Sequence, residues 1–273
     1  MATKKRQYRS VFLSDIHLGF RDCRSEYLLD FLDDLECDTL YLIGDIIDLR
    51  AMSRQLHWPS SHYQVIKKIV ALSESGTRVV YIPGNHDEPV REYVGQMFGA
   101  IEILEETVHT TAEGRELLLI HGDCLDDDIR LSRIADLLGD AVYDLVLFLN
   151  RVATRMRRLF GLPYWSLATY IKEHSGKARQ VIDSYEKAAA SLARERGYNG
   201  VVCGHIHKPE IRMLDGILYC NDGDWIESCS ALTEDASGHL HILRWTERPL
   251  ALKVYNGVVS SIPADQDDLK KIA

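Results

Sequence analysis

The sequence predicts a layered α/β fold that carries a helical insertion. Short apolar runs alternate with helical patterns through the first 125 residues, and strand-like runs return after Gly200. Strands that alternate with helices are typical of βαβ units in a layered fold. Residues 126–197, between these two parts, show helical patterns instead. With 273 residues and 46% apolar content, the chain is long enough for one large domain with an insertion.

The predicted strands of the first half are short and rich in Val, Ile, Leu and Tyr, as buried strands are. They are the segments SVFLSD (10–15), TLYLIGD (39–45), RVVYIPGN (78–85) and ELLLIHGD (116–123). Between them, apolar residues recur at helical spacing over residues 28–35 and 65–70.

The middle of the chain predicts two helices. Apolar positions recur every three or four residues from 138 to 159, and a second pattern runs from 178 to 196. After Gly200 we expect strands in the manner of a meander, to about Tyr255. The predicted units are a core over residues 1–125 and 198–260, a helical insertion over 126–197 and a C-terminal tail over 261–273.

Charge, cysteine content and hydropathy limit the class of protein. A net charge of −9 argues against general nucleic-acid binding, which needs a basic surface. Six scattered cysteines without a CxxC pair are typical of a reduced, cytoplasmic protein. The longest apolar run, LVLFL (145–149), is too short to span a bilayer. We expect a cytoplasmic protein, with peripheral contact with the inner face of a membrane as a further expectation.

Polar clusters follow five of the predicted strands. They are Asp15-x-His17, Gly44-Asp45-x-x-Asp48, Gly84-Asn85-His86-Asp87, His121-Gly122-Asp123 and Gly204-His205-x-His207. Because ligands bind beyond the carboxyl ends of strands in α/β sheets, one fold can bring these clusters together. In the last cluster, two imidazoles stand two residues apart, so a strand would direct both to one face.

The residue types in these clusters predict a metal site. Imidazole nitrogens mixed with carboxylate and amide oxygens suit Mn, Fe, Co or Zn better than Mg or Ca. The candidate ligands are Asp15, His17, Asp45, Asn85, His121, His205 and His207. Seven ligands are more than one tetrahedral zinc ion can bind. With one carboxylate as a bridge, they could hold two ions about 3.5–4 Å apart. We expect two divalent ions, with manganese first and Fe, Zn or Co as alternatives, and a phosphate group as the substrate's reacting part.

The motifs D-x-H, GDxxD, GNHD, H and GHxH resemble those of the calcineurin-like metallophosphoesterases, complete and in order over roughly residues 9–210. The resemblance implies a four-layer α/β/β/α sandwich and an enzyme that hydrolyses a phosphoric ester or anhydride by metal-hydroxide attack on phosphorus. It implies one ion on Asp15, His17, Asp45 and His207, and a second ion on Asp45, Asn85, His121 and His205, with Asp45 as the bridge.

The same resemblance gives His86 a role in the reaction rather than in metal binding. His86 would stabilise the transition state or protonate the leaving oxygen, and Asn85 would help to hold the phosphoryl oxygens. The alternative is a structural histidine paired with Asp87. Asp48 and Asp123 are expected to orient ligand histidines or to close backbone turns. The segment 219–232 is expected to close the site, with its polar residues Asn221 and Asp222 facing inward.

The insertion carries the features that point to a substrate. Residues 145–171 contain no Asp or Glu but hold four arginines and several aromatic residues. Such a segment is typical of contact with an anionic membrane or of a lid over an amphipathic substrate; the alternative is a helical hairpin packed on the core. Through this insertion and the segments HGDCLDDD (121–128) and GHIHKP (204–209), the chain resembles the UDP-2,3-diacylglucosamine diphosphatase branch of lipid A synthesis. That likeness implies cleavage of the pyrophosphate of a lipid-linked nucleotide sugar, with Lys172, Ser175 and Lys177 as candidate contacts.

One position departs from that branch, and two other functions are alternatives. The branch carries Arg where this chain has His86, so a related anhydride or diester is an alternative substrate. A nuclease or nucleotide phosphodiesterase would use the same metal centre, although the net charge of −9 argues against DNA. A non-catalytic scaffold would use the same fold, but each of the seven candidate ligands is present.

Overall fold

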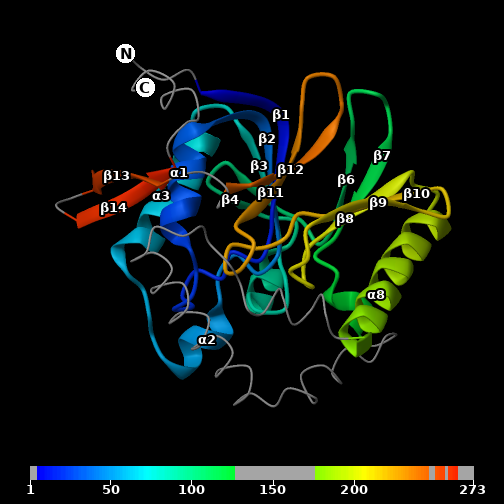
Figure 1. The fold of residues 1–273 in the computed structure, drawn as a ribbon, viewed down its shortest axis with the longest axis horizontal. Coiled ribbons are helices and arrows are strands. Elements are labelled where there is room, and N and C mark those ends of the chain that lie inside the picture. The colour runs from blue at the N-terminus through cyan, green and yellow to red at the C-terminus, as the bar shows by residue number, and fades with distance from the viewer. Residues whose placement is uncertain (1–4, 127–175, 246–249, 256–257, 264–273) are drawn as a thin grey trace.

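The computed structural model describes residues 5–126, 176–245, 250–255 and 258–263. In these ranges the chain forms two large sheets flanked by helices, and a separate pair of strands, β13 (Leu250–Tyr255) and β14 (Val258–Pro263). Figure 1 shows the two large sheets between α1 and α3 on one side and α8 on the other.

The larger sheet has seven strands in the order β12-β11-β1-β2-β3-β5-β4. Its strands are β1 (Arg6–Leu13), β2 (Leu35–Ile43), β3 (Arg78–Ile82), β4 (Met97–Phe98), β5 (Ile101–Ile103), β11 (Ser230–Glu234) and β12 (Leu240–Arg244). The central strands β1, β2, β3 and β5 are parallel, and their neighbours at both edges are antiparallel. The crossovers run through α1 (Ser25–Asp34), α2 (Leu49–Arg54) and α3 (Ser60–Glu74).

The second sheet has five strands in the order β6-β7-β8-β10-β9. They are β6 (Thr107–Thr110), β7 (Glu116–Leu119), β8 (Gly200–Cys203), β9 (Glu210–Leu214) and β10 (Ile217–Asn221). Strands β7, β8 and β10 are parallel, and β6 and β9 are antiparallel edges. Two short 3-10 helices, η1 (Glu88–Tyr93) and η2 (Asp123–Leu125), follow β3 and β7, and α8 (Gly176–Glu195) precedes β8.

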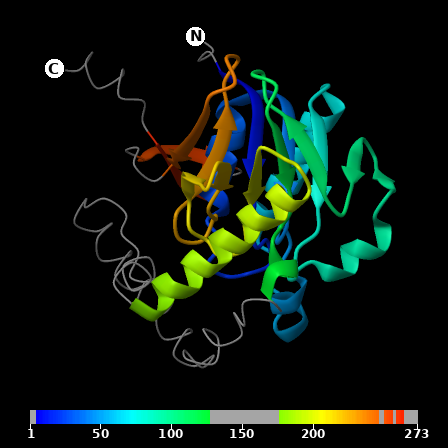
Figure 2. The same cartoon turned by 90° about the vertical axis from the view of Figure 1, so that its right-hand side faces the viewer.

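Three apolar clusters separate four layers. One cluster joins α1 and α3 to the larger sheet, and includes Leu28 and Val65. A second, between the sheets, joins Phe12 of β1 to Val202 of β8. A third joins Tyr185 of α8 to the smaller sheet, and Figure 2 shows α8 lying across that face. The predicted α/β/β/α sandwich is therefore confirmed.

The strands after Gly200 differ from the predicted meander. Strand β10 pairs in parallel with β8, and β11 leaves for the other sheet. The reason is burial: four of the five residues of β10 are buried, whereas those of β9 are half-buried or exposed. The tight turn at Asp215 and Gly216, where both residues have positive φ (48° and 86°), closes the hairpin, and its more buried strand, β10, takes the inner position between β8 and β9.

The predicted insertion is only partly within the described residues. Its second helix is α8, which packs against the smaller sheet, while its first predicted helix and its basic segment lie outside the described residues. Strand β14 ends at Pro263, inside the predicted tail. Within the described ranges, no helix combines the length and the apolar character needed to cross a bilayer.

Candidate metal centre

The seven predicted ligands lie together where β1, β2, β3, β7 and β8 end. Three groups have potential ligand atoms within 4.8 Å of one another. They are Asp15, His17 and His207; His17, Asp45 and His86; and Asp45, His121 and His205. Asn85 joins them through its Oδ1, which lies 3.3 Å from His121 Nε2. Both sheets contribute to this cluster, so the sandwich itself assembles it.

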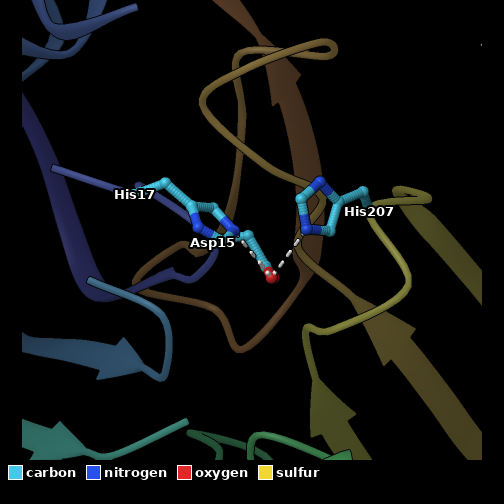
Figure 3. Close-up of side chains that lie close together, drawn as sticks. All are labelled: Asp15, His17 and His207. Carbon is cyan, nitrogen blue, oxygen red and sulfur yellow. Dashed lines mark ion pairs between the residues drawn. The ribbon is translucent and has the colours of Figure 1, made fainter. Parts of the chain in front are cut away.

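The first half of the centre is built around one oxygen of Asp15. Its Oδ1 lies 3.8 Å from Nε2 of His17 and 3.0 Å from Nε2 of His207, and Figure 3 shows the two rings on either side of the carboxylate. Its Oδ2 instead accepts hydrogen bonds from Ser14 Oγ (2.5 Å) and from the backbone N–H of His205 (2.9 Å). Oδ1 is therefore the oxygen available to a cation.

The second half shares a carboxylate with the first. Oδ2 of Asp45 lies 3.8 Å from His17 Nε2 and 3.4 Å from His121 Nε2, so it stands between the two halves. Oδ1 of Asp45 accepts the backbone N–H of His86 at 2.7 Å. His121 Nδ1 lies 3.0 Å from the carbonyl oxygen of Ile43, which leaves Nε2 to face the centre. Oδ2 of Asp45 is therefore close to histidines of both halves.

The centre contains buried polar atoms that need a partner. Among the described residues, Asp15 Oδ1 and His17 Nε2 are buried and make no hydrogen bond. Leaving such atoms unpaired is costly, and a coordinated cation removes that cost. The mixture of carboxylate, imidazole and amide donors suits divalent transition metals. The residues present therefore fit divalent cations.

The backbone at the centre is also unusual. Among the described residues, seven that are not glycine have a positive φ. Five of these seven are candidate ligands: Asp15, His17, Asp45, His205 and His207. Their φ values lie between 48° and 68°. Side chains with a Cβ rarely adopt this conformation, which clusters at functional sites because the surrounding structure must enforce it.

The expectation that His205 and His207 share one face of a strand is wrong. Strand β8 ends at Cys203, and both histidines follow it in a loop. His205 packs against His121, with ring centroids 5.2 Å apart, whereas His207 packs against His17 at 5.3 Å. The loop thus sends one imidazole to each half of the centre.

Charge and burial act together on these groups. Burial alone would lower the pKa of His17, but the nearby carboxylates of Asp15, Asp48 and Asp45 raise it to about 10. Burial opposes ionisation of Asp15, yet the charge of His207 and the nearby His17 imidazole hold its pKa well below the usual value. The pKa of Asp45 is lowered in the same way by His121, against the effect of burial. The nearby imidazoles therefore favour the ionised form of both carboxylates.

His86 is held beside the centre by Asp48. Oδ1 of Asp48 lies 2.9 Å from His86 Nδ1, and its Oδ2 lies 3.0 Å from His17 Nδ1. The predicted alternative, a pairing of His86 with Asp87, is wrong. Asp87 is fully buried and accepts the N–H groups of Gly84 (2.6 Å) and Ile46 (2.8 Å), and the hydroxyl of Tyr81. It closes the loops under the site instead.

Other polar residues near the centre have distinct partners. Asp123 forms an ion pair with Arg91 (2.8 Å), a contact with no sequence signal. Asn221, at the end of β10, donates to the carbonyl oxygen of Gly204 (2.7 Å), and Oδ1 of Asp222 lies 2.6 Å from Ser14 Oγ. The end of β10 and the residue after it therefore contact the loops that carry the ligands.

Asp126 was missed by sequence reasoning, and its carboxylate lies 2.8 Å from His205 Nε2. The predicted substrate contacts Lys172 and Ser175 lie outside the described residues. Lys177 is in α8, but its side chain lies outside them too.

Comparisons with known proteins identify the family of the chain. Residues 8–209 match the family model described as calcineurin-like phosphoesterase. A UDP-2,3-diacylglucosamine hydrolase from Aromatoleum aromaticum is 28% identical over 247 residues, which are 86% of this chain and 97% of that protein. A protein of the same name from Haemophilus influenzae strain PittGG is 26% identical over 250 residues, 86% of this chain and 98% of that protein.

Solved structures with related chains are more distant. The phosphoesterase Yfce from E. coli is 15% identical with a TM-score of 0.46, and the match covers 94% of this chain and 99% of that one. An archaeal phosphodiesterase is 13% identical with a TM-score of 0.41, over 86% and 98% of the two chains.

Proposed function

Because the chain belongs to the calcineurin-like phosphoesterase family, we propose that it hydrolyses the pyrophosphate of UDP-2,3-diacylglucosamine or of a related lipid-linked nucleotide sugar at a dinuclear metal centre. The observation that carries the dinuclear centre is Asp45 Oδ2, which lies between His17 Nε2 (3.8 Å) and His121 Nε2 (3.4 Å). The substrate is supported by the relatives named UDP-2,3-diacylglucosamine hydrolase, which match over most of their length.

The ligands divide into two sets around Asp45. We propose that Asp15, His17 and His207 hold the first ion with Asp45, and that Asn85, His121 and His205 hold the second with it. When bound, a pair of divalent cations activates water and neutralises the charge of a phosphate group. Manganese is our first choice of metal, since the donor set mixes nitrogen and oxygen ligands.

His86 is the residue we propose to act on the phosphate directly. Its Nδ1 faces Asp48, so Nε2 is the nitrogen available to a substrate, and 29% of the side chain is exposed. An imidazolium held by a carboxylate can donate a proton or a hydrogen bond to an oxygen that gains negative charge. Asn85, beside His121, can donate its amide N–H groups to the same phosphate.

The insertion over residues 126–197 is the element we propose to select the lipid part. Its basic and aromatic sequence suits an amphipathic, anionic substrate, and Lys172, Ser175 and Lys177 are candidate contacts to its phosphate and sugar. A cytoplasmic enzyme of this kind would work at the inner face of a membrane.

The substrate is tested by a panel on the manganese-loaded protein. UDP-2,3-diacylglucosamine should release UMP, whereas UDP-N-acetylglucosamine, cyclic nucleotides and single-stranded DNA should react at least tenfold more slowly. Faster hydrolysis of cyclic nucleotides or DNA would establish the phosphodiesterase or nuclease alternative. No hydrolysis of any substrate by metal-loaded protein would favour a scaffold.

The role of the insertion is tested by altering its basic segment. Deleting residues 145–165 should abolish liposome association and UDP-lipid hydrolysis. Changing the arginines Arg151, Arg155, Arg157 and Arg158 to Gln keeps the chain length, and should weaken both while hydrolysis of a small aryl phosphodiester persists. Unchanged lipid hydrolysis in both variants would contradict the proposed role.

A further inference from the structure

Asp126 is a carboxylate at the metal centre that the ligand motifs do not include. Its two oxygens lie 2.8 and 3.0 Å from Nε2 of His205. Asp126 follows η2 directly, and its backbone N–H bonds the carbonyl oxygen of Asp123, so the turn after His121 fixes its position. It is also the first residue of the predicted insertion.

The other histidines of the centre show what this contact does. His17 directs Nδ1 to Asp48 (3.0 Å), and His121 directs Nδ1 to the carbonyl oxygen of Ile43 (3.0 Å), so each keeps Nε2 for a cation. A ligand histidine usually donates its second ring N–H to such an acceptor, which fixes its tautomer and its orientation. In His205 the nitrogens are exchanged: Nε2 faces Asp126, and Nδ1 is left for the group formed with Asp45 and His121.

Tyr185 of α8 supports the same histidine from the other side. Its ring centroid lies 6.0 Å from that of His205, and its hydroxyl donates to the carbonyl oxygens of Gly204 (3.4 Å) and His121 (3.5 Å). Gly122 makes this possible, because a Cβ there would overlap the Tyr185 hydroxyl. Both ends of the insertion therefore reach the loops that carry the second ion's ligands.

We propose that Asp126 is a positioning residue that holds His205 in the orientation that binds the second ion. The first ion's ligands have different supports, since Asp15 is held by Ser14 and His17 by Asp48. Removing the Asp126 side chain should therefore weaken the binding of the second ion and leave the affinity for the first ion unchanged. This inference rests on the dinuclear centre proposed above.

The test is a manganese titration of the full chain. Binding is measured by calorimetry and by electron paramagnetic resonance, and the resonance spectrum distinguishes coupled from isolated Mn²⁺ ions. The wild type should bind two ions. Asp126→Ala should bind the second ion about 10–100-fold more weakly, the range for loss of a partner of a ligand histidine. Asp126→Asn should show a smaller loss, because its amide oxygen can still accept the Nε2–H.

Three comparisons show whether Asp126 acts through His205. Asp183→Ala is the matched control on the same insertion, since the Asp183 carboxylate lies beside Arg212 at 3.9 Å, and it should titrate as the wild type does. In a His205→Ala background, Asp126→Ala should have no additional effect on either ion. Circular dichroism at the titration temperature should show each variant folded.

Each contrary outcome has a separate meaning. Two ions bound by Asp126→Ala with wild-type affinity would overturn the role of Asp126 and leave the dinuclear centre intact. If Asp126→Ala weakened the binding of both ions equally, or had an additional effect in the His205→Ala background, the role of Asp126 would also be overturned. A wild type that binds a single ion would overturn the dinuclear centre itself, and this inference with it.

Discussion

The carboxylate of Asp48 lies 2.9 Å from Nδ1 of His86. The other oxygen of Asp48 lies 3.0 Å from His17 Nδ1, so one side chain joins a candidate metal ligand to the residue proposed to meet the phosphate. Burial opposes ionisation of Asp48, but the nearby imidazoles of His17 and His86 keep its pKa below the usual value. Asp48 also caps α2 by accepting the N–H of Ala51 at 2.6 Å, which fixes its position.

We expect His86→Ala to lose turnover while it keeps its metal. General acid catalysis by a positioned side chain contributes about 10²–10⁴-fold, so kcat on the true substrate should fall by about that factor. Manganese content, measured by mass spectrometry, should stay at the wild-type level. His57→Ala, a change outside the five motifs, is the control and should keep full turnover. A His86→Ala enzyme with wild-type kcat would remove the role assigned to His86.

We expect Asp45→Ala to lose metal from both halves of the centre. Its Oδ2 lies between His17 and His121, and its Oδ1 holds the backbone N–H of His86. The measurement is metal content after desalting, with Asp38→Ala, an exposed aspartate on β2, as the control. Retention of two tightly bound ions would show that Asp45 is not the bridge.

We expect Gly204→Ala to weaken metal binding by steric overlap. A Cβ at this position would collide with the side chain of Ser14 and with Oδ2 of Asp15, and so would move the Asp15 carboxylate. Manganese affinity and the midpoint of thermal unfolding should both fall. Gly176→Ala is the control, since its Cβ would meet no atom within 4 Å. If both variants bound manganese as the wild type does, the close packing behind Asp15 would not matter for the site.

We expect acid to destabilise the fold partly through His62. Burial and the neighbouring His57 lower the pKa of His62 from 6.5 to about 4, and its Nδ1 accepts the backbone N–H of Gly19 at 2.9 Å. Because the pKa is lower in the folded state, this contribution to stability is complete above pH 6.5 and is lost as the pH falls towards 4. The full difference is worth about 3 kcal/mol.

The comparison variant is His62→Asn, whose amide oxygen can still accept from Gly19 but does not titrate. Its free energy of unfolding, measured in urea, should fall less than that of the wild type between pH 6.5 and 4. Parallel pH profiles of the two proteins would show that His62 does not titrate in this range.

The local features of the molecule were available from the sequence. Apolar patterns located β1, β2, β3, β7, α1, α3 and α8, because runs of buried residues in the strands and one buried face in the helices are both local in sequence. The polar residues that follow these strands and β8 gave the seven candidate ligands, since parallel strands deliver their carboxyl ends to one edge.

The tertiary structure alone decided which side chains meet. The contact of His205 with Asp126 joins residues 79 positions apart, and that of His86 with Asp48 spans two separate loops. Likewise, β10 rather than β9 pairs with β8, because β10 is the more buried strand of that hairpin. Local sequence patterns determine the helices, the strands and the strand ends. The distances between residues far apart in the sequence depend on the conformation of the loops, and no periodicity in the sequence encodes that conformation.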